Sequence, residues 1–127
     1  MAAKTFKDLV VWQRAHDLVL EVYKVTAGFP KEEKFGLVSQ IRRSASSIPT
    51  NIVEGRKKRS FKEFLHFLNI ADTSLEETKY HIILSNDLGY LKSEEVDKLN
   101  CMCEEIGRML AGLQKNLQLR TYDLQLK

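Results

Sequence analysis

The sequence has few residues that interrupt helices and few that could form disulfides. Its 127 residues include only two prolines and six glycines, whereas Leu, Glu, Lys and Ala recur throughout, a balance that favours long helices over a turn-rich β fold. Cys101 and Cys103 are the only cysteines. Two residues apart on a helix, they point to nearly opposite sides, so neither a disulfide nor a shared metal site is expected. The predicted class is all-α.

Long apolar runs and a strong charge of one sign are also missing. No stretch reaches the roughly 18 apolar residues of a membrane span, and the opening Met1–Thr5 leads into amphipathic sequence without the apolar core of a signal peptide. Lys and Arg number 20 against 17 Asp and Glu, a mildly basic balance that permits a polyanion partner without demanding one. We expect one domain over residues 1–127, in the cytoplasm and without a membrane partner.

The residues that catalysis needs are scattered. His16, His66 and His81 lack the i, i+4 partner of a helical metal site, and the glycines are isolated rather than gathered in a phosphate-binding loop. A di-iron bundle would need two inward-facing Glu-x-x-His pairs, whereas Glu63 to His66 supplies only one. We therefore expect no enzyme, no metal and no cofactor.

Apolar periodicity predicts four helices, at about residues 7–26, 32–54, 61–87 and 94–118. The clearest stripe repeats in alternating steps of three and four from Val96 to Leu117. Short connections make successive helices antiparallel, which gives an up-down-up-down four-helix bundle. Pro49 lies inside the second helix, where it removes an amide donor and collides with the Ala45 carbonyl. A kink is therefore predicted near Ser46 and Ser47, whose hydroxyls could satisfy the freed backbone groups.

The first helix carries two apolar stripes. The stripe assigned to the core contains Leu9, Trp12, His16, Val19 and Tyr23, and the second, about a quarter turn away, contains Val11, Ala15, Leu18, Val22 and Val25. Phe67 and Ile70 likewise lie off the core stripe of the third helix. Two interpretations stay open: a wide face between two neighbouring helices, or a subunit interface. The candidate interface residues are Val11, Ala15, Leu18, Val22, Phe67 and Ile70.

Positive charge gathers at the connection between the second and third helices. Arg56, Lys57, Lys58, Arg59 and Lys62 place five cations within seven residues, which could contact phosphates. A solvated turn after a helix C-terminus explains the same charges. Two further cations on the second helix, Arg42 and Arg43, either assist the turn or pair with Glu54 across the kink. No aromatic residue interleaves the cationic run, so no platform for stacking on bases is visible there.

The segment from Ser39 to Arg56, together with several shorter pieces, resembles a known family: the four-helix-bundle proteins encoded in intervening sequences of bacterial 23S ribosomal RNA genes. The shorter pieces are residues 6–13, Phe29-Pro30, 35–37, 64–71 and 74–77. The resemblance implies a cytoplasmic bacterial protein related to the accessory variability proteins of diversity-generating retroelements, which form pentameric barrels and bind nucleic acid and a reverse transcriptase. It fixes the fold better than the activity.

The chain departs from that family at Ala71-Asp72-Thr73-Ser74, where a small basic element usually precedes the third helix's Leu-x-Glu. The change lowers positive charge along the third helix but leaves the basic turn untouched. The leading hypothesis is a non-catalytic, homo-oligomeric bundle, expected to be a pentamer, that binds the RNA or DNA backbone through the basic turn. The alternative is a protein-interaction scaffold that does not bind nucleic acid directly.

Overall fold

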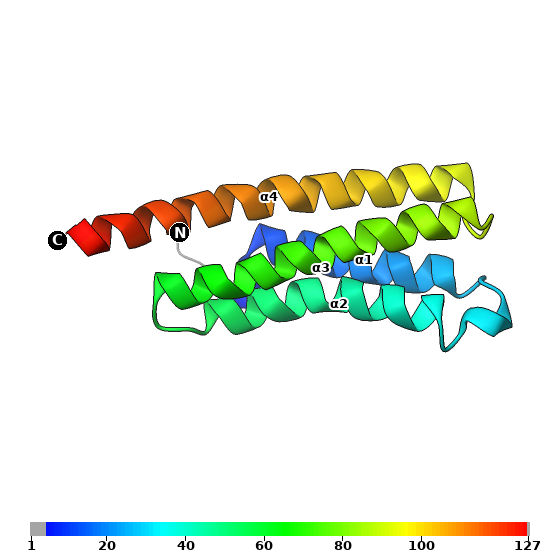
Figure 1. Cartoon of the computed structure of the whole chain (residues 1–127), viewed down its shortest axis with the longest axis horizontal. Helices are drawn as coiled ribbons and strands as arrows, with labels where there is room; N and C mark the ends of the chain where they lie inside the picture. Colours follow the sequence, from blue (N-terminus) through cyan, green and yellow to red (C-terminus); the bar gives the residue numbers. More distant parts are fainter. Residues whose placement is uncertain (1–4, 127) are drawn as a thin grey trace.

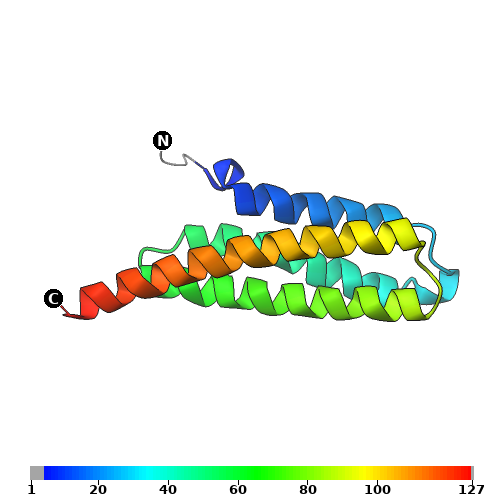
Figure 2. The ribbon, with the colours of Figure 1, turned by 90° about the horizontal axis from the view of Figure 1, so that it is seen from above.

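The computed structural model describes residues 5–126, with side chains through Thr121. Residues 1–4 and 127, which the predicted single domain included, lie outside the described part. Four α-helices dominate: α1 (Val10–Thr26), α2 (Leu37–Arg56), α3 (Phe61–Asp87) and α4 (Ser93–Leu126), with 3₁₀ turns η1 (Phe6–Asp8) and η2 (Lys31–Glu33) before α1 and α2. They lie lengthwise in one bundle, and α4 extends beyond the other helices at its C-terminal end (Figures 1 and 2). The predicted all-α class is confirmed.

Neighbouring helices are antiparallel, because the residues that touch run in opposite order along each pair. Arg14 of α1 pairs with Glu105 of α4, and further along α1 Glu21 pairs with the earlier residue Lys98. Between α2 and α3 the same reversal holds, since Ser44 bonds Thr78 and the later Ser47 bonds the earlier Ser74. The other two pairs are joined by Thr26 with Arg42 and by Asn69 with Gln114, and their helices run in opposite directions in Figures 1 and 2. The helices therefore follow one another around the bundle in an up-down-up-down order.

The helix boundaries of α3 agree with the prediction, whereas α1 and α2 begin later than expected. Thr5 accepts a hydrogen bond from the Lys7 amide and Asp8 accepts one from the Thr5 amide, a capping box that encloses η1. Leu9 then has extended backbone, so α1 starts at Val10. The spacing of Thr5 and Asp8 is that of a capping box, which explains why α1 does not begin at residue 7.

On α1, the stripe that fills the core is the second one, about a quarter turn from the stripe that was assigned to the core. Val11, Ala15, Leu18 and Val22 are buried within the single chain, so these side chains are not open to a second subunit and their assignment as an oligomer interface was wrong. His16 and Tyr23 of the predicted core stripe are exposed. The reason is chemical: the buried stripe has no side-chain polar atom to desolvate, whereas the outer one carries an imidazole and a phenol.

The core stripe predicted for α4 is confirmed, and α2 also buries a single apolar stripe. On α2, five apolar side chains spaced at three and four residues are buried: Val38, Ile41, Ala45, Ile48 and Ile52. On α4, the buried members of the predicted stripe are Leu99, Cys103, Ile106, Leu110 and Leu117. Each of these helices offers only one such stripe, so the choice of inward face was unambiguous.

Polar side chains also enter the core, between α2 and α3. The Thr78 hydroxyl donates to the buried Ser44 hydroxyl across 2.9 Å, and the hydroxyls of Ser47 and Ser74 lie 2.8 Å apart. The Asn51 amide donates to both the carbonyl and the hydroxyl oxygen of Ser47. Apolar periodicity did not predict these contacts, because it assigns hydroxyl side chains on a helix to the face exposed to solvent.

The helix α2 continues through Pro49, and the kink predicted there stays a prediction. The two serines beside it bond elsewhere than expected. The Ser46 hydroxyl donates to the Arg43 carbonyl at 3.2 Å, and the Ser47 hydroxyl bonds Ser74 of α3.

The two cysteines differ in environment, which predicts different reactivity. Cys103 is buried in the core, and this desolvation raises the pKa of its thiol to about 11; Cys101 is exposed. A thiolate is the reactive form, so at neutral pH Ellman's reagent should label one thiol per native chain and two after unfolding. Rapid labelling of both native thiols would contradict this placement.

The burial of Cys103 also predicts a pH dependence of stability. Because the pKa of the Cys103 thiol rises from 9.0 to about 11 on folding, the folded state should lose stability as the pH rises from 9 towards 11.

Candidate nucleic-acid interface

The basic turn joins two helix ends. Arg56 ends α2, Lys57 to Ser60 form the connection, and Lys62 lies in the first turn of α3. The Ser60 hydroxyl caps α3 by accepting a hydrogen bond from the Glu63 amide at 3.1 Å. Arg59 and Lys62 therefore lie beside the positive N-terminal end of α3, where a helix dipole disfavours cations. The helix-end explanation fits Arg56 and Lys57 but not these two.

The cations of the turn differ in how firmly they are held. Lys57, Lys58, Arg59 and Lys62 are exposed, whereas Arg56 is half-buried. The Lys58 ammonium lies 5.1 Å from the centre of the Phe67 ring, a cation–π contact that ties the turn to α3. Lys57 and Arg59 lie in the short connection and Lys62 lies in the first turn of α3, and all three exposed side chains are open to a phosphate.

A cation that sequence reasoning missed lies at the same end of the bundle. The Arg120 guanidinium of α4 is 5.3 Å from the centre of the Phe61 ring, next to Lys62. Arg120 falls beyond the predicted end of that helix at residue 118, whereas α4 continues to Leu126. The antiparallel order alone places the end of the fourth helix beside the start of the third, so correct helix length was the missing signal.

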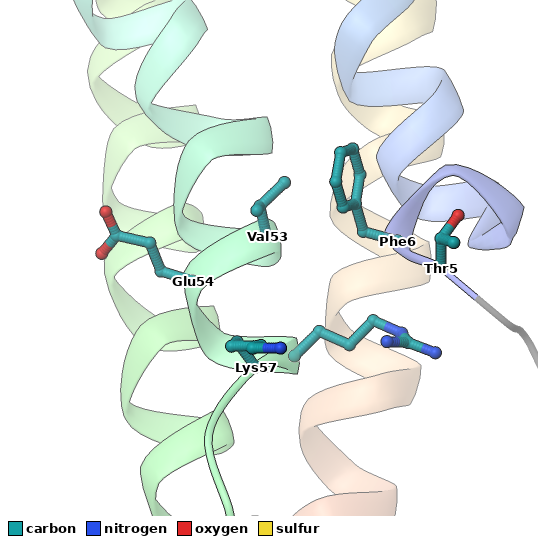
Figure 3. Close-up of a pocket in the computed structure, with 6 residues that line it drawn as sticks. Thr5, Phe6, Val53, Glu54 and Lys57 are labelled. Atoms are coloured by element: carbon teal, nitrogen blue, oxygen red, sulfur yellow. The ribbon is translucent and has the colours of Figure 1, made fainter.

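Beside the turn lies a cavity of about 490 Å³ between η1 and the end of α2. Its lining includes Phe6 and Val53, which face each other across the gap in Figure 3, with Lys57 at its edge. Glu54 points away from the gap in the same view. The cavity is mostly apolar apart from the basic residues at its mouth, so it offers phosphate contacts only at that rim.

Arg42 and Arg43 do not join the basic turn. Fourteen residues of continuous helix separate Arg42 from Arg56, about 21 Å at the rise of an α-helix. Arg42 instead donates to the Thr26 hydroxyl at 2.9 Å and to the Tyr23 carbonyl at 3.4 Å, near the C-terminal end of α1. The predicted alternative, pairing of Arg42 or Arg43 with Glu54, would have to span eleven or twelve residues of the same helix, about 16–18 Å, which is too far for an ion pair.

The remaining two candidate interface residues are both on α3. Phe67 is half-buried under Lys58 and against Gly55, whereas Ile70 is 36% exposed. Ile70 is thus the member of the predicted interface set with an open side chain.

The described residues contain no group of three or more potential metal ligands. His16 stacks on Trp12 with ring centres 5.1 Å apart, and buried His81 lies 3.7 Å from the Glu77 carboxylate. Within the same part of the chain, no helix combines the length and apolarity that crossing a membrane requires.

Taken together, these features define a small four-helix bundle with cations concentrated at one end. The chain belongs to the 23S rRNA-intervening sequence protein family, whose model matches residues 7–112. It is also similar to a crystal structure from Bacteroides thetaiotaomicron, described as a protein with unknown function from the S23 ribosomal protein family. The two share 28% identity at a TM-score of 0.75, over 84% of this chain and 99% of the other. No curated protein matches the sequence.

Proposed function

We propose that this protein is a non-catalytic, homo-oligomeric bundle that binds the phosphate backbone of RNA or DNA through the basic turn. The observation that carries the proposal is the crowding of Arg56 to Arg59, Lys62 and Arg120 at one end of the bundle. Two carboxylates lie close to these cations in the sequence. Glu54 points away from the adjacent cavity in Figure 3, and Glu63 lies in the first turn of α3. The surface therefore suits a polyanion.

The oligomer is part of the same proposal, as the pentamer that the family resemblance implies. Apolar side chains that the single chain leaves open support it, among them Leu20 at 56% exposure and Ile83 at 56%. A ring would repeat the basic turn once per subunit, and repeated weak contacts on one polymer add up to tight binding. The cytoplasmic location implied by the resemblance belongs to the proposal as well.

The test reverses the three exposed cations of the turn, with Lys57, Lys58 and Arg59 all changed to Glu. Arg56 is kept because it is half-buried. Duplex DNA and structured RNA are titrated across a salt series, and each lost phosphate contact should lower the slope of log affinity against log salt by about one. We expect the slope to fall by about three and the affinity at low salt to drop by at least about tenfold.

The matched control changes three exposed lysines elsewhere, Lys24, Lys31 and Lys92, to Glu. Both variants then have the same net charge, so a general electrostatic effect would weaken binding equally in the two. Equal slopes for the two variants would refute a localised site at the turn.

The open apolar side chains also fit the second candidate function, a scaffold that binds a larger protein such as a reverse transcriptase. In that case a partner captured from cells should stay bound after nuclease treatment, and the purified chain should bind neither polymer at low salt.

A further inference from the structure

A second cationic surface lies at the other end of α2, and aromatic rings accompany it. A groove of about 400 Å³ runs between the end of α1 and the start of α2. Tyr23, Phe35, Lys34, Arg42 and Arg43 contribute to its lining, and no carboxylate does. The sequence places these residues on three separate segments, so their meeting becomes visible only in the fold.

Phe35 is the most exposed of the large apolar residues in the described chain, with 89% of its surface open. Burying such a ring would be worth about 1.5–3 kcal/mol, yet it stands in solvent between η2 and α2. The Lys34 ammonium lies 5.4 Å from the ring centre. An aromatic face held open beside a cation is the combination that single-stranded nucleic-acid sites use, since the base stacks and the phosphate pairs with the cation.

Arg42 is held at the groove by contacts with α1. The Arg42 guanidinium lies 4.4 Å from the centre of the Tyr23 ring and is fixed by its hydrogen bonds to Thr26 and Tyr23. The nearby carboxylate of Glu33 is occupied, because it accepts from the Tyr90 hydroxyl at 3.0 Å and from the Leu37 amide. Arg43 is exposed on the same helix and is therefore available to a phosphate.

We infer that the groove formed by Tyr23, Lys34, Phe35, Arg42 and Arg43 binds an unpaired nucleotide of a single strand, with the base stacked on Phe35 and the flanking phosphates near Lys34 and Arg43. The inference rests on the proposed nucleic-acid binding but uses different residues. A duplex keeps its bases stacked inside and has no free face for the ring. The two surfaces thus differ in the form of polymer that each contacts.

The test compares three probes on the full chain by fluorescence anisotropy: a 12-nucleotide oligouridylate, an abasic strand with the same number of phosphates, and a 12-base-pair RNA duplex. Phe35→Leu keeps an apolar side chain but removes the ring, and Phe35→Tyr keeps the ring. We expect Phe35→Leu to weaken oligouridylate binding by about five- to a hundredfold, with little change for the other two probes. Phe35→Tyr should bind like the wild type.

Three results would overturn the inference: unchanged oligouridylate binding by Phe35→Leu, equal wild-type affinity for the abasic strand, or a change in oligomer mass by light scattering on losing the ring. The last result would assign Phe35 to a contact between copies. The outcome is separable from that of the basic turn, because the turn variant is judged on duplex binding and Phe35→Leu on the single strand alone.

Discussion

Replacement of Leu18 by Asp is expected to unfold the chain rather than to separate its subunits. Leu18 has no exposed surface in the single chain, so the substitution removes a buried side chain and puts a carboxylate into apolar surroundings. Such changes cost more than about 4 kcal/mol, a large part of the roughly 5–15 kcal/mol that stabilises a domain. Circular dichroism should show loss of helix, or a urea midpoint far below that of the wild type.

Leu20→Asp is the matched control, because it makes the same change two residues away on the same helix. Leu20 is 56% exposed in the single chain, so its replacement should keep the helix content and change the chain's own free energy of unfolding by no more than about 0.5 kcal/mol. An effect of Leu20→Asp on the proposed oligomer would appear in the oligomer mass and not in the helix content. If Leu18→Asp instead gave a folded chain of lower oligomer mass, the buried stripe of α1 would be a subunit interface after all.

Gly55→Ala should destabilise the bundle although it adds a single methyl group. Gly55 lies near the end of α2, where α3 approaches closely. A Cβ atom there would lie 2.8 Å from Cβ of Phe67 and 2.9 Å from a ring carbon of Phe64. Since Cβ of Phe67 moves only with its backbone, α3 must shift, and overpacking of this kind costs about 1–3 kcal/mol. Urea denaturation followed by circular dichroism measures the loss.

Gly112→Ala, in contrast, is expected to stabilise the protein. Gly112 is inside α4, and beyond the adjoining backbone of that helix nothing lies within 4 Å of the new Cβ, so the helix preference of Ala should stabilise the protein by about 0.5–1 kcal/mol. Opposite signs for the two variants would show that the close α2–α3 approach, rather than the glycine itself, sets the effect. Two changes of the same sign would contradict this.

The bundle was predictable where each helix offers one apolar stripe. The bounds of α3, from Phe61 to Asp87, and the inward faces of α2 and α4 follow from periodicity and helix-end signals. The prediction failed on α1, because two stripes share one period and only their polar atoms distinguish them. It also missed Thr78, His81 and Ser85, which are buried on α3, since periodicity weighs apolar residues alone.

The candidate sites were predictable only where their residues are contiguous in sequence. The basic turn lies within seven residues and is correctly placed between two helices. Arg42 was grouped with it by charge, although the length of α2 separates them. Arg120 and Phe35 were not found, because each becomes meaningful through neighbours brought in by the fold. The rise per residue of a helix would have placed Arg42 too far from Arg56 to join the basic turn.

The hydroxyl contacts between α2 and α3 have a consequence for how this chain selects one alignment. Apolar stripes repeat every turn or two, so a slip of one turn, about 5.4 Å, could still bring apolar side chains together. The same slip would separate Ser44 from Thr78 and Ser47 from Ser74. The Ser44 and Thr78 hydroxyls are buried, and each one left unpaired would cost about 1–3 kcal/mol. The polar pairs therefore favour one axial alignment of α2 against α3. This alignment sets the positions of the charged residues at both ends of α2 along the bundle.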